Sequence, residues 1–347
     1  MKRILIIFLV ICLMGALAAG CTGEDRPMPP DGYAQVNFNN TLLIRPDFYF
    51  FDEGCFYALD GFYNMGVYRN RGGKPEKLFE ESDFPGWLDD FIVCGSDLYF
   101  VMTNEDGSWL YRYDLKTDTH EQLYPIANSA YMGVLGELVV YQDRSDMKNQ
   151  KLRVLDLRTG EDRIAMEGIE VFGLVDGEVR CVVRKEDYEI YRVEPVTGAR
   201  ELLGTFSVDH EGYYANYSFA SEHILLRFTN SGGTFWSFSQ ADGTVTAHTM
   251  PKNIREMVAG DNAVFLLVYE EDRYSSTAIP SPENGVYRVD LRNGSCEQVY
   301  AEIDDQTKIY VESDDCIYLT NLNTVYRLEL NAGTCEKVFK LKRVFGN

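Results

Sequence analysis

The sequence predicts an all-β fold made of one repeated unit, and three observations carry that prediction. A hairpin pattern recurs along the chain, as in LYRYDLKTDTHEQL (110–123), EIYRVEPVTGAREL (189–202), GVYRVDLRNGSCEQV (285–299) and TVYRLELNAGTCEKV (324–338). The copies are about 43 residues apart on average, a period typical of propeller blades. A second pair of apolar segments precedes each hairpin, so each unit holds four strands. We therefore expect a single β-propeller with seven four-stranded blades.

Each hairpin carries a turn residue at the same place. A short hairpin loop needs one residue at positive φ, which glycine adopts freely and which Asp tolerates better than most residues. The pattern predicts this conformation for Gly160, Gly198, Gly243, Gly294 and Gly333, and for Asp118 in the second copy.

The inner strands are predicted from apolar runs such as Ala263–Val268, which lose the alternation of a half-exposed strand. A sheet buried on both faces cannot stand alone, so the units are expected to stack around an axis. Segment 36–44 is expected to complete the last blade. Six or eight blades stay open because two copies are degenerate, and two sandwich domains are the rival architecture. The expected blades are 45–80, 87–125, 130–166, 169–206, 213–250, 252–301 and 306–341.

The N-terminus predicts export and a lipid anchor. A basic start at Lys2 and Arg3 precedes a short apolar run, as in a secretory signal peptide over residues 1–20. Leu17-Ala18-Ala19-Gly20-Cys21 resembles a bacterial lipobox, in which the cysteine thiol is acylated. Residues 21–35 are then a lipid-attached flexible tether and residues 36–347 the propeller. The predicted location is the cell membrane, lipid-anchored and facing the extracytoplasmic side.

Charge and cysteine content narrow the possibilities further. The formal net charge of −21 disfavours a nucleic-acid partner, because phosphate backbones are repelled. No C-x-x-C pair is present, and the strand positions of the cysteines place their thiols too far apart for disulfides. The chain is expected to hold six buried thiols, at Cys55, Cys94, Cys181, Cys296, Cys316 and Cys335.

No motif predicts catalysis, a metal or a cofactor. The four histidines have no metal-ligand spacing and are interpreted as surface or satisfied side chains (His120, His210, His223 and His248). Carboxylates are abundant, but spacing along the chain does not show whether two of them meet as a glycosidase pair. No catalytic or metal residue is therefore predicted.

Aromatic side chains on long loops are the candidate binding residues. Propeller connections between blades emerge on one face, and segments 80–90, 205–220 and 270–285 are unusually long. Exposed Tyr and Trp bury a large area at small entropic cost, although such rings also pack loops onto a scaffold. The candidates are Phe84, Trp87, Tyr213, Tyr214 and Tyr274.

The repeat, in the form IYLTNLNTVYRLELNAGTCEKV (317–338), resembles the β-propeller repeats of bacterial lipoproteins, which are distantly similar to TolB-like and receptor-type propellers. The resemblance covers about residues 45–341 and implies a fold, not a reaction. The leading hypothesis is a membrane-tethered, non-catalytic binding or scaffold module for a protein, peptide or glycan. The alternatives are a glycan lyase or hydrolase with its site at the channel mouth, and an accessory subunit of an envelope assembly or transport complex.

Overall fold

The structure is a computed structural model of the chain. It describes residues 33–34, 48–51, 54–59, 66–71, 74–208, 215–220, 222–228, 231–250, 253–260, 262–269, 283–304, 307–321 and 324–340. The predicted acylation site Cys21 and the segment 36–44 lie outside the described residues. The described part of the chain has no helix of the length and hydropathy that crossing a bilayer requires.

The first two sheets are antiparallel meanders of consecutive strands, joined by the short 3-10 turn η2 (Glu81–Asp83). The first contains β2 (Phe48–Phe51), β3 (Gly54–Leu59), β4 (Gly66–Arg71) and β5 (Lys74–Glu80). The second contains β6 (Trp87–Cys94), β7 (Asp97–Asn104), β8 (Gly107–Asp114) and β9 (Thr119–Ile126).

The next sheet has five strands because β1 (Tyr33–Ala34) pairs with the free edge of β10. It contains β10 (Ser129–Leu135), β11 (Leu138–Asp143), β12 (Lys151–Asp156) and β13 (Asp162–Glu167) besides β1. Tyr33 lies opposite Leu135, and Ala34 lies opposite Val134. Residues at the end of the segment that the sequence assigned to a tether therefore form part of a sheet.

The remaining sheets repeat the four-stranded meander. One contains β14 (Val171–Val175), β15 (Glu178–Arg184), β16 (Tyr188–Val193) and β17 (Arg200–Phe206), and the next contains β18 (Ala215–Phe219), β19 (His223–Phe228), β20 (Thr234–Ser239) and β21 (Val245–Thr249). The last two are β22 (Ile254–Ala259), β23 (Ala263–Val268), β24 (Gly285–Asp290) and β25 (Cys296–Tyr300), then β26 (Thr307–Ser313), β27 (Cys316–Asn321), β28 (Thr324–Glu329) and β29 (Thr334–Lys340).

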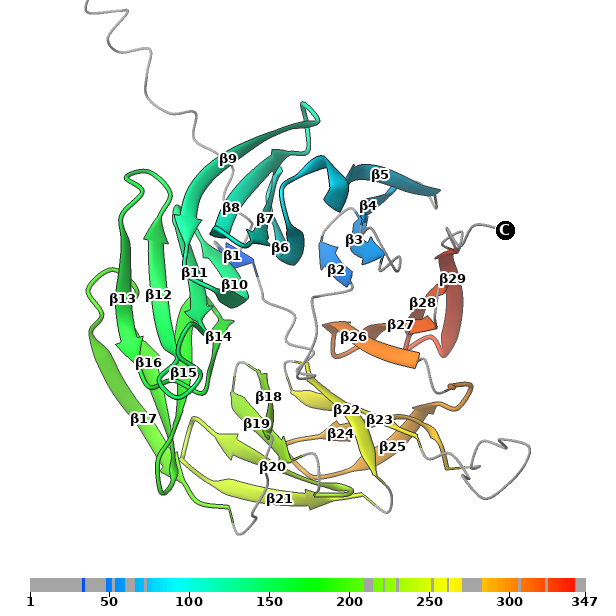
Figure 1. Cartoon of the computed structure of the whole chain (residues 1–347). Coiled ribbons are helices and arrows are strands. Elements are labelled where there is room, and N and C mark those ends of the chain that lie inside the picture. Colours follow the sequence, from blue (N-terminus) through cyan, green and yellow to red (C-terminus); the bar gives the residue numbers. More distant parts are fainter. Residues whose placement is uncertain are drawn as a thin grey trace, which may run out of the picture.

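The sheets stand around a common axis, which makes the fold a single all-β propeller (Figure 1). The prediction of seven four-stranded blades is wrong: the described strands form six four-stranded blades, and the remaining sheet is five-stranded. The physical reason is the unpaired inner edge of β10, which accepts the backbone of β1. A repeat pattern cannot reveal this pairing, since β1 lies outside the repeats.

Within each sheet the strand order follows the chain from the axis outwards. The first strands of neighbouring sheets contact each other: β6 contacts β10, β14 contacts β18, and β22 contacts β26. At the junction between the first and last sheets, the outer strands β5 and β29 are in contact. All described sheets except the five-stranded one are made of consecutive strands. The described strands of the first and last sheets therefore meet by side-chain packing and share no ladder.

The core lies between the faces of adjacent sheets. β23 is buried at every position, as its continuous apolar run predicts, whereas the outer strand β9 is mostly exposed. The predicted turns are confirmed: the turn glycines have positive φ, and Asp118 adopts φ 54° in place of glycine. Asp118 also accepts a hydrogen bond from Arg69 of the first sheet at 3.3 Å, so this turn ties two sheets together.

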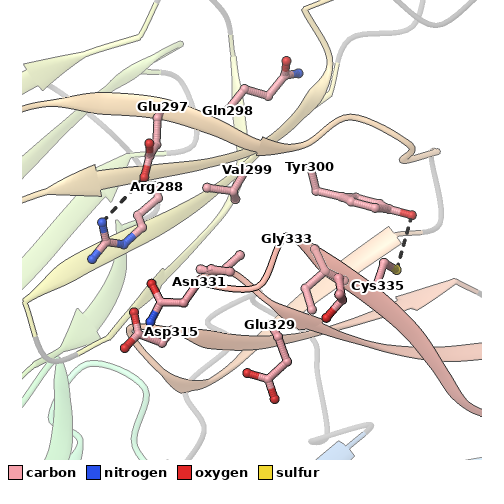
Figure 2. Close-up of a pocket in the computed structure, with 13 residues that line it drawn as sticks. Arg288, Glu297, Gln298, Val299, Tyr300, Asp315, Glu329, Asn331, Gly333 and Cys335 are labelled. Atoms are coloured by element: carbon pink, nitrogen blue, oxygen red, sulfur yellow. Dashed lines mark hydrogen bonds and ion pairs between the residues drawn. The ribbon is translucent and has the colours of Figure 1, made fainter.

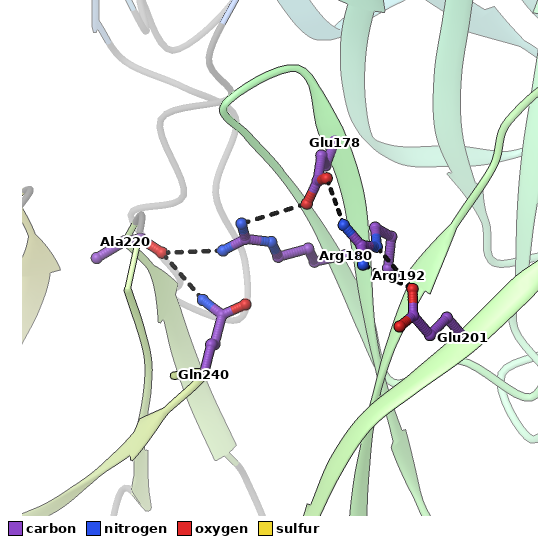
Figure 3. A network of polar contacts seen from close by, with 6 residues as sticks. All are labelled: Glu178, Arg180, Arg192, Glu201, Ala220 and Gln240. Carbon is purple, nitrogen blue, oxygen red and sulfur yellow. Dashed lines mark hydrogen bonds and ion pairs between the residues drawn. The ribbon is translucent and has the colours of Figure 1, made fainter. Parts of the chain in front are cut away.

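A polar network joins the sheets β14–β17 and β18–β21 (Figure 3). The buried guanidinium of Arg180 donates to the carbonyl oxygen of Ala220 at 3.3 Å, and so does the side-chain amide of Gln240. Glu178 pairs with Arg180 at 3.4 Å and with Arg192 at 2.7 Å. A buried charge is tolerated here because both an acid and a carbonyl compensate it. We interpret this network as structural.

Candidate functional site

The starts of neighbouring first strands lie together at one end of the ring. Near the start of β22, Glu256 accepts a hydrogen bond from the backbone N–H of Ile309 on β26, at 3.1 Å. Near the start of β6, Asp90 accepts from the backbone N–H of Met132 on β10. Since the second strands run antiparallel to the first, they finish at this same end. We call it the axial end.

The connection that leads into β6 is firmly held. Glu80 and Asp83 cap η2 reciprocally, with the Glu80 N–H donating to Asp83 Oδ2 at 2.7 Å. Gly86 has φ 115°, and a Cβ there would lie 2.1 Å from the carbonyl oxygen of Thr103. Only glycine therefore fits at position 86, where the backbone runs close to Thr103 immediately before Trp87.

The predicted binding aromatics differ in their positions. Phe84 is only 8 % exposed, and its ring packs edge-on against Phe100 and His120, with ring centroids 5.1 Å and 4.8 Å away. Trp87 is 42 % exposed, and its indole N–H donates to Asp89 Oδ1 at 3.1 Å. The other three candidates, Tyr213, Tyr214 and Tyr274, lie outside the described residues.

Three arginine side chains stack on tyrosine rings at the axial end. Each guanidinium carbon lies 5.8 or 5.9 Å from the centre of its ring. The pairs are Arg144 with Tyr131, Arg184 with Tyr188, and Arg255 with Tyr269. We call Arg144, Arg184 and Arg255 the axial arginines. A guanidinium over an aromatic face is held by cation–π attraction and keeps its N–H donors free at the rim.

Local structure places each axial arginine. Arg144 directly follows β11 and Arg184 ends β15, so both lie where a second strand reaches the axial end. Arg255 occupies a bulge in β22, where the register shifts between Ile254 and Glu256. A bulge re-aims the side chain of its extra residue out of the sheet. Buried Arg227 fixes this bulge by donating to the carbonyl oxygens of Ile254 at 2.7 Å and of Arg255 at 3.3 Å.

Three acidic side chains at the axial end, Asp90, Glu170 and Glu256, have a raised pKa and so retain protons more readily than usual. Burial raises the pKa of Glu170 against the opposing effect of Arg184 and Arg144, and it raises the pKa of Asp90 well above its usual range. Burial likewise raises the pKa of Glu256 to about 7. Because desolvation penalises the charged form, these acids compensate less of the arginine charge than exposed carboxylates would.

Sequence reasoning missed the axial arginines, although a signal was present. In GELVVYQDR and GEVRCVVR the arginine closes an apolar run that forms a second strand, at residues 144 and 184. The same residue type near the end of consecutive repeats predicts a shared location once the ring is known. Without the ring, each arginine looks like an ordinary strand terminus.

A cleft lies between the outer strands of the last two sheets (Figure 2). This cleft has a volume of about 400 Å³. Its floor includes Val299 and Leu328, which belong to the apolar packing between those sheets. On its rim Arg288 faces Glu297 at 3.6 Å, so its charge is already compensated. We interpret the cleft as the open margin of sheet packing, and the axial end as the candidate site.

The prediction of six buried thiols is wrong for two of them. Cys181 and Cys316 are buried and Cys94 is half-buried, but Cys296 and Cys335 are exposed; all five are free thiols. Cys296 pairs across the ladder with buried Val289, and Cys335 with buried Leu328, so each shares a face with a core residue. Both cysteines nevertheless lie on outermost strands, β25 and β29, where most described positions are exposed. The side chain of Cys55 lies outside the described part of the structure.

Histidines and acids form no metal centre in the described part of the chain, where no group of three or more His, Cys, Asp or Glu side chains is placed to hold an ion. His248 bonds Ser237 Oγ through Nε2 at 2.8 Å and stacks on Phe235. Burial lowers the pKa of His248 and of His223. The rings of His120 and His248 have structural partners, as the sequence predicted, whereas the buried Nδ1 of His223 has no hydrogen-bond partner in the described part of the chain.

The fold thus defines a class, the all-β single propeller, and comparison with known proteins places it among solved propellers. No known protein family matches the chain, and no curated protein matches it. The β-propeller domain of the Trilobed protease from Pyrococcus furiosus, described as having an open velcro topology, aligns with a TM-score of 0.58 at 13% identity. The alignment covers 88% of this chain and 98% of that one.

Two further structures mark how far the likeness extends. The tricorn protease aligns with a TM-score of 0.53 at 11% identity over 90% of this chain, which spans only 34% of that protein. TolB from Acinetobacter baumannii aligns with a TM-score of 0.38 at 12% identity, over 84% of this chain and 77% of TolB. The identities of 11% and 13% to the tricorn and Trilobed proteases show the fold alone, since one propeller architecture serves many functions.

Proposed function

We propose that this protein is a non-catalytic binding module, held at the extracytoplasmic side of the cell membrane by a lipid on Cys21. The propeller would bind a protein, peptide or glycan ligand at its axial end. The lipid anchor rests on the sequence around Cys21, which follows a basic and apolar leader. Stable attachment requires at least two acyl chains, which the lipobox chemistry would supply.

The observation that carries the binding role is the gathering of stacked arginines at one end of a rigid ring. Most other arginines are neutralised by nearby acids, as Arg153 is by Asp162 at 3.0 Å. The axial arginines are instead held over tyrosine rings, and of these arginines Arg184 and Arg255 are exposed while Arg144 is half-buried. Exposed Trp87, at the start of β6, adds an aromatic anchor at that end. Pre-arranged hydrogen-bond donors beside an exposed aromatic side chain are typical of a recognition surface.

A peptide and glycan array probed with the purified chain tests this function. Ligands found on the array should bind at least about ten-fold more weakly to Arg184→Gln or Trp87→Ala. The matched control is Arg292→Gln, because Arg292 is 63% exposed in the turn between β24 and β25, away from the axial end. Ligands that lose the same affinity with the control variant, or an array with no ligand, would contradict the proposal.

The anchor is tested separately by metabolic labelling with a radioactive fatty acid in a bacterial host. The parent chain should be labelled and recovered in the membrane fraction. Cys21→Ser should be unlabelled and released. Labelling that persists in Cys21→Ser would remove the anchor from the proposal without affecting the binding site.

A propeller enzyme is the second candidate, and one observation favours it. Glu256, with a pKa of about 7, lies beside Arg227 and Arg255, and a carboxyl poised near neutrality suits general acid catalysis. Product release from acidic polysaccharides that disappears in Glu256→Gln would establish the enzyme and displace the non-catalytic role.

A further inference from the structure

The two exposed thiols occupy equivalent positions in the last two sheets. Cys296 and Cys335 each lie two residues after a turn glycine with positive φ, Gly294 or Gly333, near the start of an outermost strand. Both are free and exposed. The repeat has therefore placed the same side chain twice in the same setting, and any difference between the two sites comes from the sheet that precedes each of them.

The preceding sheets offer the two thiols different partners. Cys296 Sγ lies 3.6 Å from Sδ of Met250, which directly follows β21. Cys335 Sγ lies 3.8 Å from the hydroxyl oxygen of Tyr300, at the end of β25 (Figure 2). One position thus joins a thiol to a thioether, and the equivalent position joins a thiol to a phenol.

Met250 presents its sulfur from a fixed position. Its side chain is only 8 % exposed and belongs to the apolar core between the sheets β18–β21 and β22–β25, where it packs with Leu225 and Phe235. Cys296 closes the contact from the solvent side. The pair therefore has one donor atom held by the core and a second donor atom that a solute can reach.

Two sulfur donors select a particular kind of ion. Thiolate and thioether ligands are soft and favour Cu(I) over Mg²⁺, Ca²⁺ and Mn²⁺. A metal–sulfur bond is about 2.3 Å long, so two such bonds span up to about 4.6 Å, and sulfurs 3.6 Å apart can both reach one ion. In the described part of the chain no three His, Cys, Asp or Glu side chains are placed to hold an ion, so an ion that requires three such ligands has no site there.

We propose that Cys296 and Met250 form a binding site for a monovalent copper ion. The Cys296 thiol loses its proton to solvent and its thiolate bonds to Cu(I), while Met250 Sδ donates a lone pair; the ion keeps its oxidation state. A water molecule or a thiol from solution can complete the coordination on the exposed side. Cys335 forms no such site, because a phenol oxygen is a hard donor. This inference is independent of any ligand at the axial end.

Anaerobic titration of the full chain with Cu(I), in competition with the chromophoric chelator bicinchoninate, tests the site. Met250→Leu keeps the thiol and nearly the same apolar volume, so the packing should survive. We expect Met250→Leu to weaken Cu(I) binding at least about ten-fold and Cys296→Ser to abolish the tight site. The matched control Cys335→Ser removes the equivalent thiol and should change the affinity less than about two-fold.

X-ray absorption at the copper edge tests the same ligands without any substitution. The parent chain labelled with selenomethionine should show a copper–selenium distance together with a copper–sulfur distance, because only a methionine ligand carries selenium. A spectrum without copper–selenium scattering would overturn the inference whether or not the variants fold. An equal loss of affinity in Cys335→Ser and Cys296→Ser would overturn it too, since exposed thiols in general would then explain the binding.

Discussion

Glu256 on β22 accepts a hydrogen bond from the backbone N–H of Ile309 on β26, with 3.1 Å between nitrogen and oxygen. The bond crosses from one sheet to the inner edge of the next and satisfies a donor that the ladder leaves unused. Burial raises the pKa of this carboxyl to about 7, and Arg255 and Arg227 limit the rise. The same group therefore links ring assembly to proton binding.

Stability should depend on pH through Glu256. A Glu in an unfolded chain titrates near pH 4.3, so between about pH 4.3 and 7 the folded protein keeps a proton that the unfolded chain has lost. The contribution of this proton is complete at low pH and is lost as pH rises through 7. Gln at 256 can still accept from Ile309 without this dependence, and we expect Glu256→Gln to exceed the parent by about 2 kcal/mol at pH 8.

Urea unfolding of both proteins at several pH values between 5 and 8 measures this effect as a difference. Other carboxyls cancel in that difference, including Asp90. The exposed Glu297→Gln serves as the control and should show a constant difference. A Glu256→Gln difference that stays flat with pH would contradict the account.

Phe84 and Trp87, three residues apart, should respond oppositely to truncation. Phe84 fills an aromatic cluster with Phe79, Phe100 and Tyr111, so Phe84→Ala should lower the free energy of unfolding by about 3–4 kcal/mol. Trp87 is exposed, and Trp87→Ala should cost less than about 1 kcal/mol while weakening ligand binding. Chemical denaturation and binding measured on both variants check the pair; a stable Phe84→Ala protein that has lost binding would reverse the two roles.

The thiols should differ in reactivity in the native state. Cys296 and Cys335 are exposed, whereas Cys181 is fully buried. Burial raises the thiol pKa of both Cys181 and Cys296, so exposure decides which thiol a reagent reaches. We expect a maleimide to label Cys296 and Cys335 within minutes and Cys181 only on unfolding, because the thiolate is the reactive form. Peptide mapping by mass spectrometry identifies the labelled sites. Rapid native labelling of Cys181 would show that the inner strand is not packed as described.

Gly86 should tolerate no side chain. Its φ of 115° strains any other residue, and a methyl group on its Cα would lie 2.1 Å from the Thr103 carbonyl oxygen, which is a backbone clash. We expect Gly86→Ala to destabilise the protein by at least about 2 kcal/mol and to displace Trp87. Gly243→Ala, at a turn with open space around it, should cost less. Equal melting temperatures for the two variants would be the contrary result.

The sequence allowed the local features of the fold to be predicted, because they depend on neighbouring residues. The positive φ of Asp118 follows from turn chemistry, and the burial of Ala263–Val268 follows from the absence of alternation. The exposure of Cys335 does not follow, since it depends on where a neighbouring sheet ends. Pairing of Tyr33 with Leu135 likewise joins residues far apart in sequence that share no pattern.

The candidate site was the least predictable part for the same reason. Arg144, Arg184 and Arg255 come from different sheets, and only closure of the ring brings their strand ends to one side. The long loops predicted aromatic binding residues, and of these Trp87 lies at the axial end while Phe84 packs inward. A residue type indicates which chemistry a side chain can perform, but whether several such side chains meet at one site depends on the path of the whole chain.

The packed junction between β5 and β29 has a consequence for how such a ring can change over time. Apart from the added β1, no described strand is lent from one terminus to complete a blade at the other. Duplication or deletion of one whole repeat would thus leave every described ladder of consecutive strands intact and alter only the packing between sheets. Circular permutants opened at any connection between blades should accordingly fold, and gene lineages can gain or shed a repeat without passing through a broken sheet.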